Sequence, residues 1–176
     1  MAVWNHIDHT SLSLPAATVT WTSISGSYDH LLLLLSARSD QSTYVSGMSM
    51  KFNSATSTYS ETRMFASNTA SITSNRKHGE SILRAWGDAA GASVLADTFS
   101  SNTVWIPNYS NTTSFKQFVS QSAVANNSTA SGQSSRMESA GLWSSASAIT
   151  RIDIGIVNGD DFVANSTFDL YGILGA

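Results

Sequence analysis

The chain has 176 residues and a formal net charge of −3, and only 12% of its residues are charged, whereas 33 are serine and 17 are threonine. The few basic residues are scattered, which argues against a nucleic-acid-binding protein, and the absence of cysteine excludes disulfides, thiolate nucleophiles and cysteine-ligated zinc. Because 41% of the residues are hydrophobic, the chain can still bury one core, and we expect a single folded domain.

The first 17 residues show no strong strand pattern, and we interpret them as an N-terminal arm that precedes one β-sandwich domain at 18–176. The arm carries three apolar residues, Trp4, Ile7 and Leu12, that could contact a neighbouring subunit. Equally, the arm could cap its own domain. It has neither the basic nor the apolar region of a signal peptide, so we expect synthesis and assembly in the cytoplasm.

Metal-binding residue types cluster in this arm at His6, Asp8 and His9. In a regular strand, His6 and Asp8 would share one face and His9 would point to the other. Two ligands on one face do not complete a metal site. We therefore expect a polar arm and no bound metal or other cofactor.

Alternation of apolar and polar residues recurs along the chain and predicts antiparallel strands. The expected strand-like segments are 18–22, 44–52, 93–99, 103–106, 114–123, 136–143, 152–156 and 167–174. Asn158-Gly159 predicts a tight turn, and short helical turns are expected at 59–66 and 88–96. The predicted fold class is all-β, an antiparallel two-sheet sandwich of about eight strands that resembles a jelly roll.

Five consecutive leucines at 31–35 interrupt the alternation, because a strand there would carry apolar side chains on both faces. A helix is the alternative, since leucine favours helices. The run is short and is surrounded by strand patterns, so we prefer a central strand whose outer face a loop or another subunit covers. It is far too short to span a membrane.

No catalytic pattern stands out. The segment Gly47-Met48-Ser49-Met50-Lys51 lacks the second glycine of a nucleophile elbow, and no spacing pairs any two of the three glutamates as a glycosidase would need. The segment 87–91 lacks the lysine of a phosphate-binding loop. We predict a protein that is not an enzyme, without catalytic or cofactor-binding residues.

Loops on β-sandwiches carry recognition, and two loops supply the remaining candidates for an interface. Trp86 precedes Gly87-Asp88 and is the tryptophan that we expect to be exposed, either as a carbohydrate contact or as an interface residue. Asn108 and Tyr109 follow a predicted strand and are the other candidates.

Several short segments carry a family resemblance. They are Tyr28-Asp29-His30-Leu31-Leu32-Leu33 with Arg38, Met50-Lys51-Phe52-Asn53 with Tyr59-Ser60, Ile106-Pro107-Asn108-Tyr109 and Phe168-Asp169-Leu170-Tyr171-Gly172-Ile173. Together they resemble small jelly-roll virion structural proteins of tailed bacteriophages. The resemblance extends from about Ser27 to Leu174, and its motifs are structural rather than catalytic.

This resemblance implies a virion protein that is assembled in the host bacterial cytoplasm. Its most direct form is a capsid decoration (cement) protein that binds the major capsid protein and itself, as a homotrimer, and stabilises the head shell. The alternative is the receptor-binding or carbohydrate-binding head of a tail fibre or knob. No coiled coil or collagen-like repeat precedes Thr18, which favours the decoration protein. Neither role requires nucleic acid or a membrane as partner.

Overall fold

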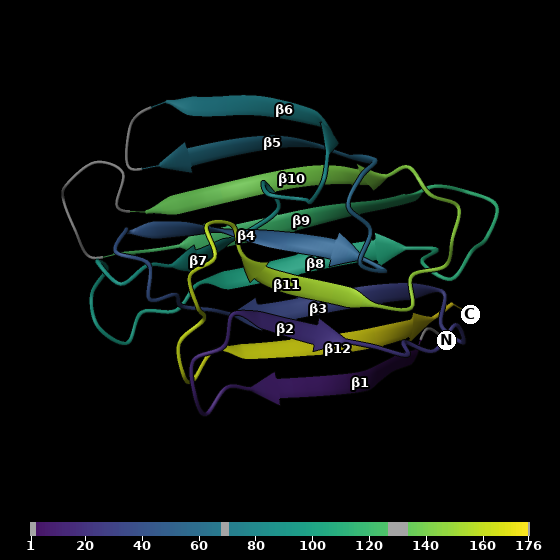
Figure 1. The fold of residues 1–176 in the computed structure, drawn as a ribbon, viewed down its shortest axis with the longest axis horizontal. Helices are drawn as coiled ribbons and strands as arrows, with labels where there is room; N and C mark the ends of the chain where they lie inside the picture. The colour runs from purple at the N-terminus through teal and green to yellow at the C-terminus, as the bar shows by residue number, and fades with distance from the viewer. Residues whose placement is uncertain (1–2, 68–70, 127–133, 176) are drawn as a thin grey trace.

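A computed structural model describes residues 3–67, 71–126 and 134–175. These residues form strands and connecting loops without any helix, and so contain no helix that could cross a membrane (Figure 1). The strands are β1 (Val3–Ser11), β2 (Thr18–Trp21), β3 (His30–Ser36), β4 (Val45–Phe52), β5 (Tyr59–Ser67), β6 (Ile72–Glu80), β7 (Asp88–Ala90), β8 (Ser101–Pro107), β9 (Lys116–Val124), β10 (Ser135–Trp143), β11 (Ile152–Ile156) and β12 (Thr167–Leu174).

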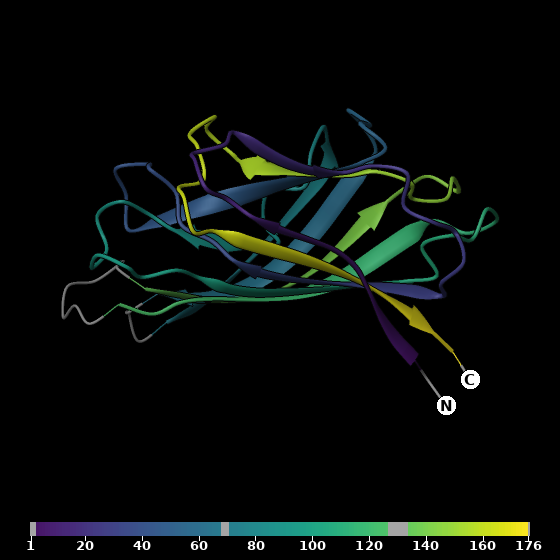
Figure 2. The same ribbon diagram turned by 90° about the horizontal axis from the view of Figure 1, so that it is seen from below.

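The strands form two stacked sheets, which Figure 2 shows edge-on. The larger sheet has eight strands in the order β1-β12-β3-β8-β9-β10-β5-β6, and the smaller has four in the order β2-β11-β4-β7. Every pairing between these strands is antiparallel. The predicted two-sheet antiparallel sandwich is therefore confirmed.

Eight of the strands follow the jelly-roll order. They divide into a four-strand unit β1-β12-β3-β8 in the larger sheet and the complete smaller sheet β2-β11-β4-β7. Each step along the chain changes sheets except that from β4 to β7, so that two Greek keys wrap one core. The remaining strands are two insertions, β5-β6 between β4 and β7 and β9-β10 between β8 and β11. Both insertions widen the larger sheet, which extends well beyond the smaller one (Figure 1).

The leucine run is the strand β3, as predicted, and it lies between β12 and β8 in the larger sheet. Leu31, Leu33 and Leu35 point into the core between the sheets and are buried. Leu32 and Leu34 point to the outer face, where Leu34 is 37% exposed. No described segment of the chain covers this outer face (Figure 2).

Two predicted helical turns and one predicted strand are wrong. Residues 59–66 lie in β5, whose backbone pairs with β10 on one side and β6 on the other. Residues 88–90 form β7, which pairs with β4. Residues 93–99 form turns instead of a strand. The Arg38 guanidinium donates to four backbone carbonyls of this loop, those of Ala92, Val94, Leu95 and Thr98, which face it instead of a neighbouring strand.

The segment interpreted as an N-terminal arm supplies the edge strand of its own sheet. Val3–Ser11 pairs along its length with the closing strand β12, from Val3 opposite Leu174 to Ser11 opposite Thr167. The two ends of the chain consequently lie side by side (Figure 1). A domain boundary at residue 17, as predicted, would divide the edge strand β1 from the sheet to which it belongs. The described part of this segment is therefore not a free arm.

Candidate functional site

The outer face of the larger sheet carries a row of mixed side chains that comes from five strands. The pairing register places Leu32, Trp105, Val119, Ala140 and Thr62 side by side across β3, β8, β9, β10 and β5. A second row lies one pleat further along. It contains Leu34, Thr103, Gln121, Glu138 and Met64.

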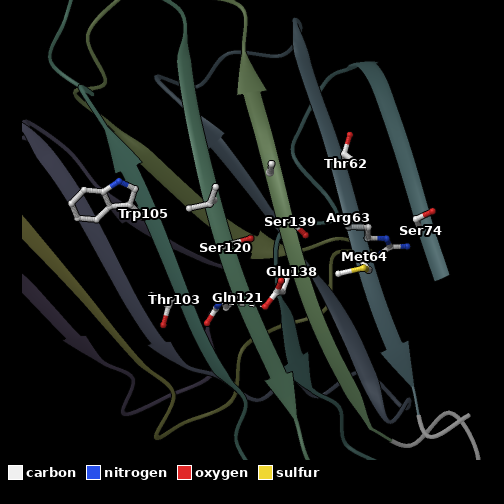
Figure 3. A pocket seen from close by; sticks show the side chains of 12 residues that line it. Thr62, Arg63, Met64, Ser74, Thr103, Trp105, Ser120, Gln121, Glu138 and Ser139 are labelled. Carbon is white, nitrogen blue, oxygen red and sulfur yellow. Dashed lines mark hydrogen bonds between the residues drawn. The ribbon is translucent and has the colours of Figure 1, made fainter. Parts of the chain in front are cut away.

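All the residues of these two rows except Leu32 and Leu34 line a hollow of about 460 Å³. Figure 3 shows Trp105 on one side of this hollow and Met64 on the other, with Gln121 and Glu138 between them. Gln121 Nε2 donates to Glu138 Oε1 at 3.4 Å, and the same oxygen lies 3.2 Å from Arg136 Nη2. The hollow therefore combines apolar side chains with a small charged and hydrogen-bonding group.

Exposed apolar side chains gather on this face. Val119 is 54% exposed, Met64 49% and Ile72 69%. With Trp4 and Leu34, they make up half of the large hydrophobic residues that are exposed in the described chain. We call these five residues, together with Trp105, the outer patch. Exposed apolar side chains that gather on one face of a protein mark a candidate contact surface.

The inner side of the same strands binds the segment that carries Trp86. Ser120 Oγ donates to the Trp86 carbonyl at 2.6 Å, and Ser139 Oγ donates to the Ala85 carbonyl. The Glu61 carboxylate accepts the backbone N–H of Ala85 at 2.9 Å. Burial raises the pKa of Glu61, and the backbone N–H donors oppose that rise only in part.

Trp86 is consequently buried, and the prediction that it is exposed is wrong. The hydrogen bonds of Ser120 and Ser139 draw its loop beneath the larger sheet, where Trp86 joins the main core. Its side chain cannot contact a glycan or a partner in this conformation. Trp105 is the tryptophan in the hollow, and the alternation of Val104 and Ile106 with Thr103 and Trp105 is the signal that could have found it.

The two candidates that follow β8 have opposite environments. Tyr109 is buried, and its hydroxyl donates to the Ser25 carbonyl, so this interface candidate is not accessible to a partner. Asn108 is exposed in a left-handed backbone conformation with φ 50°, and its N–H donates to His30 Nδ1 at 3.2 Å. Asn108 therefore remains accessible, in the turn that follows β8.

The three candidates from the predicted arm also differ. Trp4 is 60% exposed on the outer face of β1. Ile7 and Leu12 are half-buried and pack against the main core. Only Trp4 of these three is available to a partner.

A β-bulge in β1 changes which polar side chains meet. His6 pairs with Tyr171 and Asp8 pairs with Leu170, so that Ile7 is an extra residue and the strand changes phase. His6 and His9 therefore share the outer face, and the expectation that His6 shares it with Asp8 is wrong. Asp169 of β12 completes the group, 2.7 Å from His9 Nδ1 and 3.4 Å from His6 Nε2.

The smaller sheet carries a polar hollow of about 560 Å³ on its own outer face. There the Arg151 guanidinium contacts the Asp153 carboxylate at 2.6 and 2.9 Å, and Thr20 Oγ1 donates to it at 2.8 Å. Burial raises the pKa of Asp153, but the bonds from Arg151, Thr20 and Ser54 outweigh it and the net pKa is lowered. This ion pair is satisfied within the sheet.

Neither a family model nor a curated protein matches this chain. The fold and the site define a widened jelly-roll sandwich with an open sheet face that carries both apolar and polar side chains.

Proposed function

We propose that the protein is a structural component of a tailed-phage virion, a decoration protein that binds the head shell through the outer patch. The observation that carries this proposal is the open outer face of the larger sheet, on which apolar side chains from β1 to β6 lie uncovered in the described chain. The short segments that resemble phage virion proteins support the phage part of this proposal, and the jelly roll is an architecture that capsid proteins use.

The composition supports a role that depends on buried contact. Only 12% of the residues are charged, so the desolvation cost of covering a broad face is small. A wide sheet face offers many weak contacts, and multiple copies bound to neighbouring shell subunits would add avidity without a deep pocket. We expect the partner to be the major capsid protein, with a homotrimer as the bound form and no catalysis.

The location of the protein on purified particles tests this proposal. Virions of the phage that encodes this protein should each contain hundreds of copies of it, counted by quantitative mass spectrometry. About a dozen copies or fewer would assign the protein to the tail, and none would remove it from the virion. Either result would overturn the proposal.

A matched pair of substitutions tests the binding face. Val119→Lys places a charge in the middle of the outer patch, whereas Leu14→Lys places one on an equally apolar residue, 74% exposed, in the connection between β1 and β2. We expect Val119→Lys to abolish sedimentation with undecorated particles and Leu14→Lys to leave it unchanged. Equal binding by both variants would show that the shell contacts another face.

One observation favours a second function, glycan binding by a tail-fibre head. Trp105 lies in the same hollow as the hydrogen-bonding side chains of Thr103, Gln121 and Glu138, and glycan sites combine an aromatic platform with such groups. A glycan array with the purified protein tests this alternative. Binding that is lost in Trp105→Ala would favour it, and no binding at millimolar sugar would remove it.

A further inference from the structure

We propose that His6, His9 and Asp169 form a binding site for one first-row divalent metal ion, with Zn²⁺ as the best-suited ion. The three side chains come from the two strands that bring the ends of the chain together. Their potential ligand atoms all lie within 4.8 Å of one another. This inference is independent of the proposed virion function.

The β-bulge is the feature that builds the site. In a regular strand without the bulge, His6 and His9 are three positions apart and would point to opposite faces of the sheet. With the bulge, both imidazoles lie on the outer face, and Asp169 lies directly across from His9 in the neighbouring strand. Bulges re-aim side chains in this way beside functional sites.

The spacing suits a tetrahedral ion after small side-chain movements. Ligands at about 2.0–2.1 Å from Zn²⁺ lie about 3.4 Å from one another in a tetrahedral arrangement. Asp169 Oδ1 is already 3.4 Å from His6 Nε2 and 2.7 Å from His9 Nδ1. Both histidines are about half exposed, with side-chain exposures of 47%, so their rings can adjust without disturbing the core.

The donor set selects the class of ion. Two imidazoles and one carboxylate match the three-ligand sites in which Zn²⁺ keeps a fourth position for water, whereas Ca²⁺ and Mg²⁺ prefer all-oxygen sites. Tyr171 helps to orient the first ligand, because its ring packs 5.1 Å from the His6 ring at an angle of 60°. A bound ion would join the edge strand β1 to β12 through side chains as well as through backbone hydrogen bonds.

Isothermal titration of the untagged protein with Zn²⁺ tests the site. We expect one ion per chain in the wild type, and at least a tenfold loss of affinity in His6→Ala, His9→Ala and Asp169→Asn. The chain supplies a matched control, because His78 is an exposed histidine on β6 at the opposite edge of the same sheet. His78→Ala should bind Zn²⁺ like the wild type.

Three results would overturn the proposal: no binding at 1 mM Zn²⁺, unchanged affinity in the three ligand variants, or an equal loss in His78→Ala. A second measurement guards against variants that fold poorly. Zn²⁺ should raise the melting temperature of the wild type and of His78→Ala, but not that of Asp169→Asn, which keeps the size of the side chain it replaces. An equal rise in Asp169→Asn would also contradict the site.

Discussion

The Tyr59 hydroxyl forms two hydrogen bonds with the backbone of Phe52 and thereby links the two sheets. It accepts from the Phe52 N–H at 2.8 Å and donates to the Phe52 carbonyl at 3.2 Å. Tyr59 begins β5 in the larger sheet, and Phe52 ends β4 in the smaller one. The phenol thus pairs with a backbone N–H and a carbonyl that a neighbouring strand would otherwise bind. Burial of the hydroxyl raises the pKa of Tyr59 to about 12.

Replacing this phenol with a ring that lacks the hydroxyl should destabilise the fold. Tyr59→Phe leaves the N–H and the carbonyl of Phe52 unpaired in the core, at a cost of about 1–3 kcal/mol. Urea denaturation of the wild type and the variant measures this loss. Tyr44→Phe, at a tyrosine that is 38% exposed, should change the free energy of unfolding by less than about 0.5 kcal/mol.

A cross-strand contact in the larger sheet requires glycine at position 141. Gly141 of β10 lies opposite Phe118 of β9, and a Cβ at Gly141 would come within 2.1 Å of the Phe118 ring. Gly141→Ala should therefore displace a buried ring and cost about 1–3 kcal/mol. Gly26→Ala is the control, because a Cβ there would meet only Ser110 Cβ, at 3.8 Å. Equal melting temperatures of the two variants would contradict the expected clash.

Much of the fold could be predicted from local pattern. Alternation predicts β4, β9, β10 and β11, because successive side chains of a strand point to opposite faces. The leucine run is a central strand, as the strand patterns around it predict. The loops were harder. Trp86 is buried because Ser120 and Ser139 bind its loop from strands that are distant in sequence, and no local pattern records such a contact.

The candidate sites were less predictable than the fold for a similar reason. The pairing of His6 with His9 depends on one extra residue in β1, and a one-residue change of phase exchanges the two faces of a strand. Asp169 lies about 160 residues further along the chain and joins them only through the register of β12. The outer patch depends on the order of the strands, which alternation alone does not give.

Two buried carboxyls should make the stability depend on pH. Burial raises the pKa of Glu61 and of Asp88, so the folded state binds their protons more tightly than the unfolded state does. The stabilisation that results is fully present below the unfolded pKa values of these groups and is lost as pH rises through the folded ones. Each tenfold difference in proton affinity corresponds to about 1.4 kcal/mol.

The double variant Glu61→Gln/Asp88→Asn isolates this contribution. Its amide oxygens can still accept from the Ala85 N–H and the Ser135 hydroxyl. As the pH rises from 4 to 7.5, the free energy of unfolding should therefore fall more, or rise less, in the wild type than in the double variant. Urea titrations across this range measure the difference. Glu138→Gln, at an exposed carboxylate on β10, should keep the wild-type profile, and a parallel profile in the double variant would refute the assignment.

The Arg38 guanidinium organises the loop between β7 and β8 and should be irreplaceable by lysine. Its Nη1 donates to the carbonyls of Leu95 and Thr98 at 2.9 and 3.0 Å, and its Nη2 donates to those of Ala92 and Val94 at 3.3 and 3.4 Å. A lysine ammonium is a compact point donor and cannot reproduce this planar fork. Arg38→Lys should therefore release most of these carbonyls, at a cost of about 1–3 kcal/mol.

Hydrogen exchange gives the local signature of that loss. Backbone N–H groups at 92–98 should exchange faster in Arg38→Lys, while those of β9 and β10 keep their protection, because the loop opens without unfolding the sheet. Arg76→Lys, at an exposed position on β6, is the matched control and should leave the loop unchanged. Unaltered exchange at 92–98 in Arg38→Lys would show that the loop holds its conformation through its own turns and not through the guanidinium.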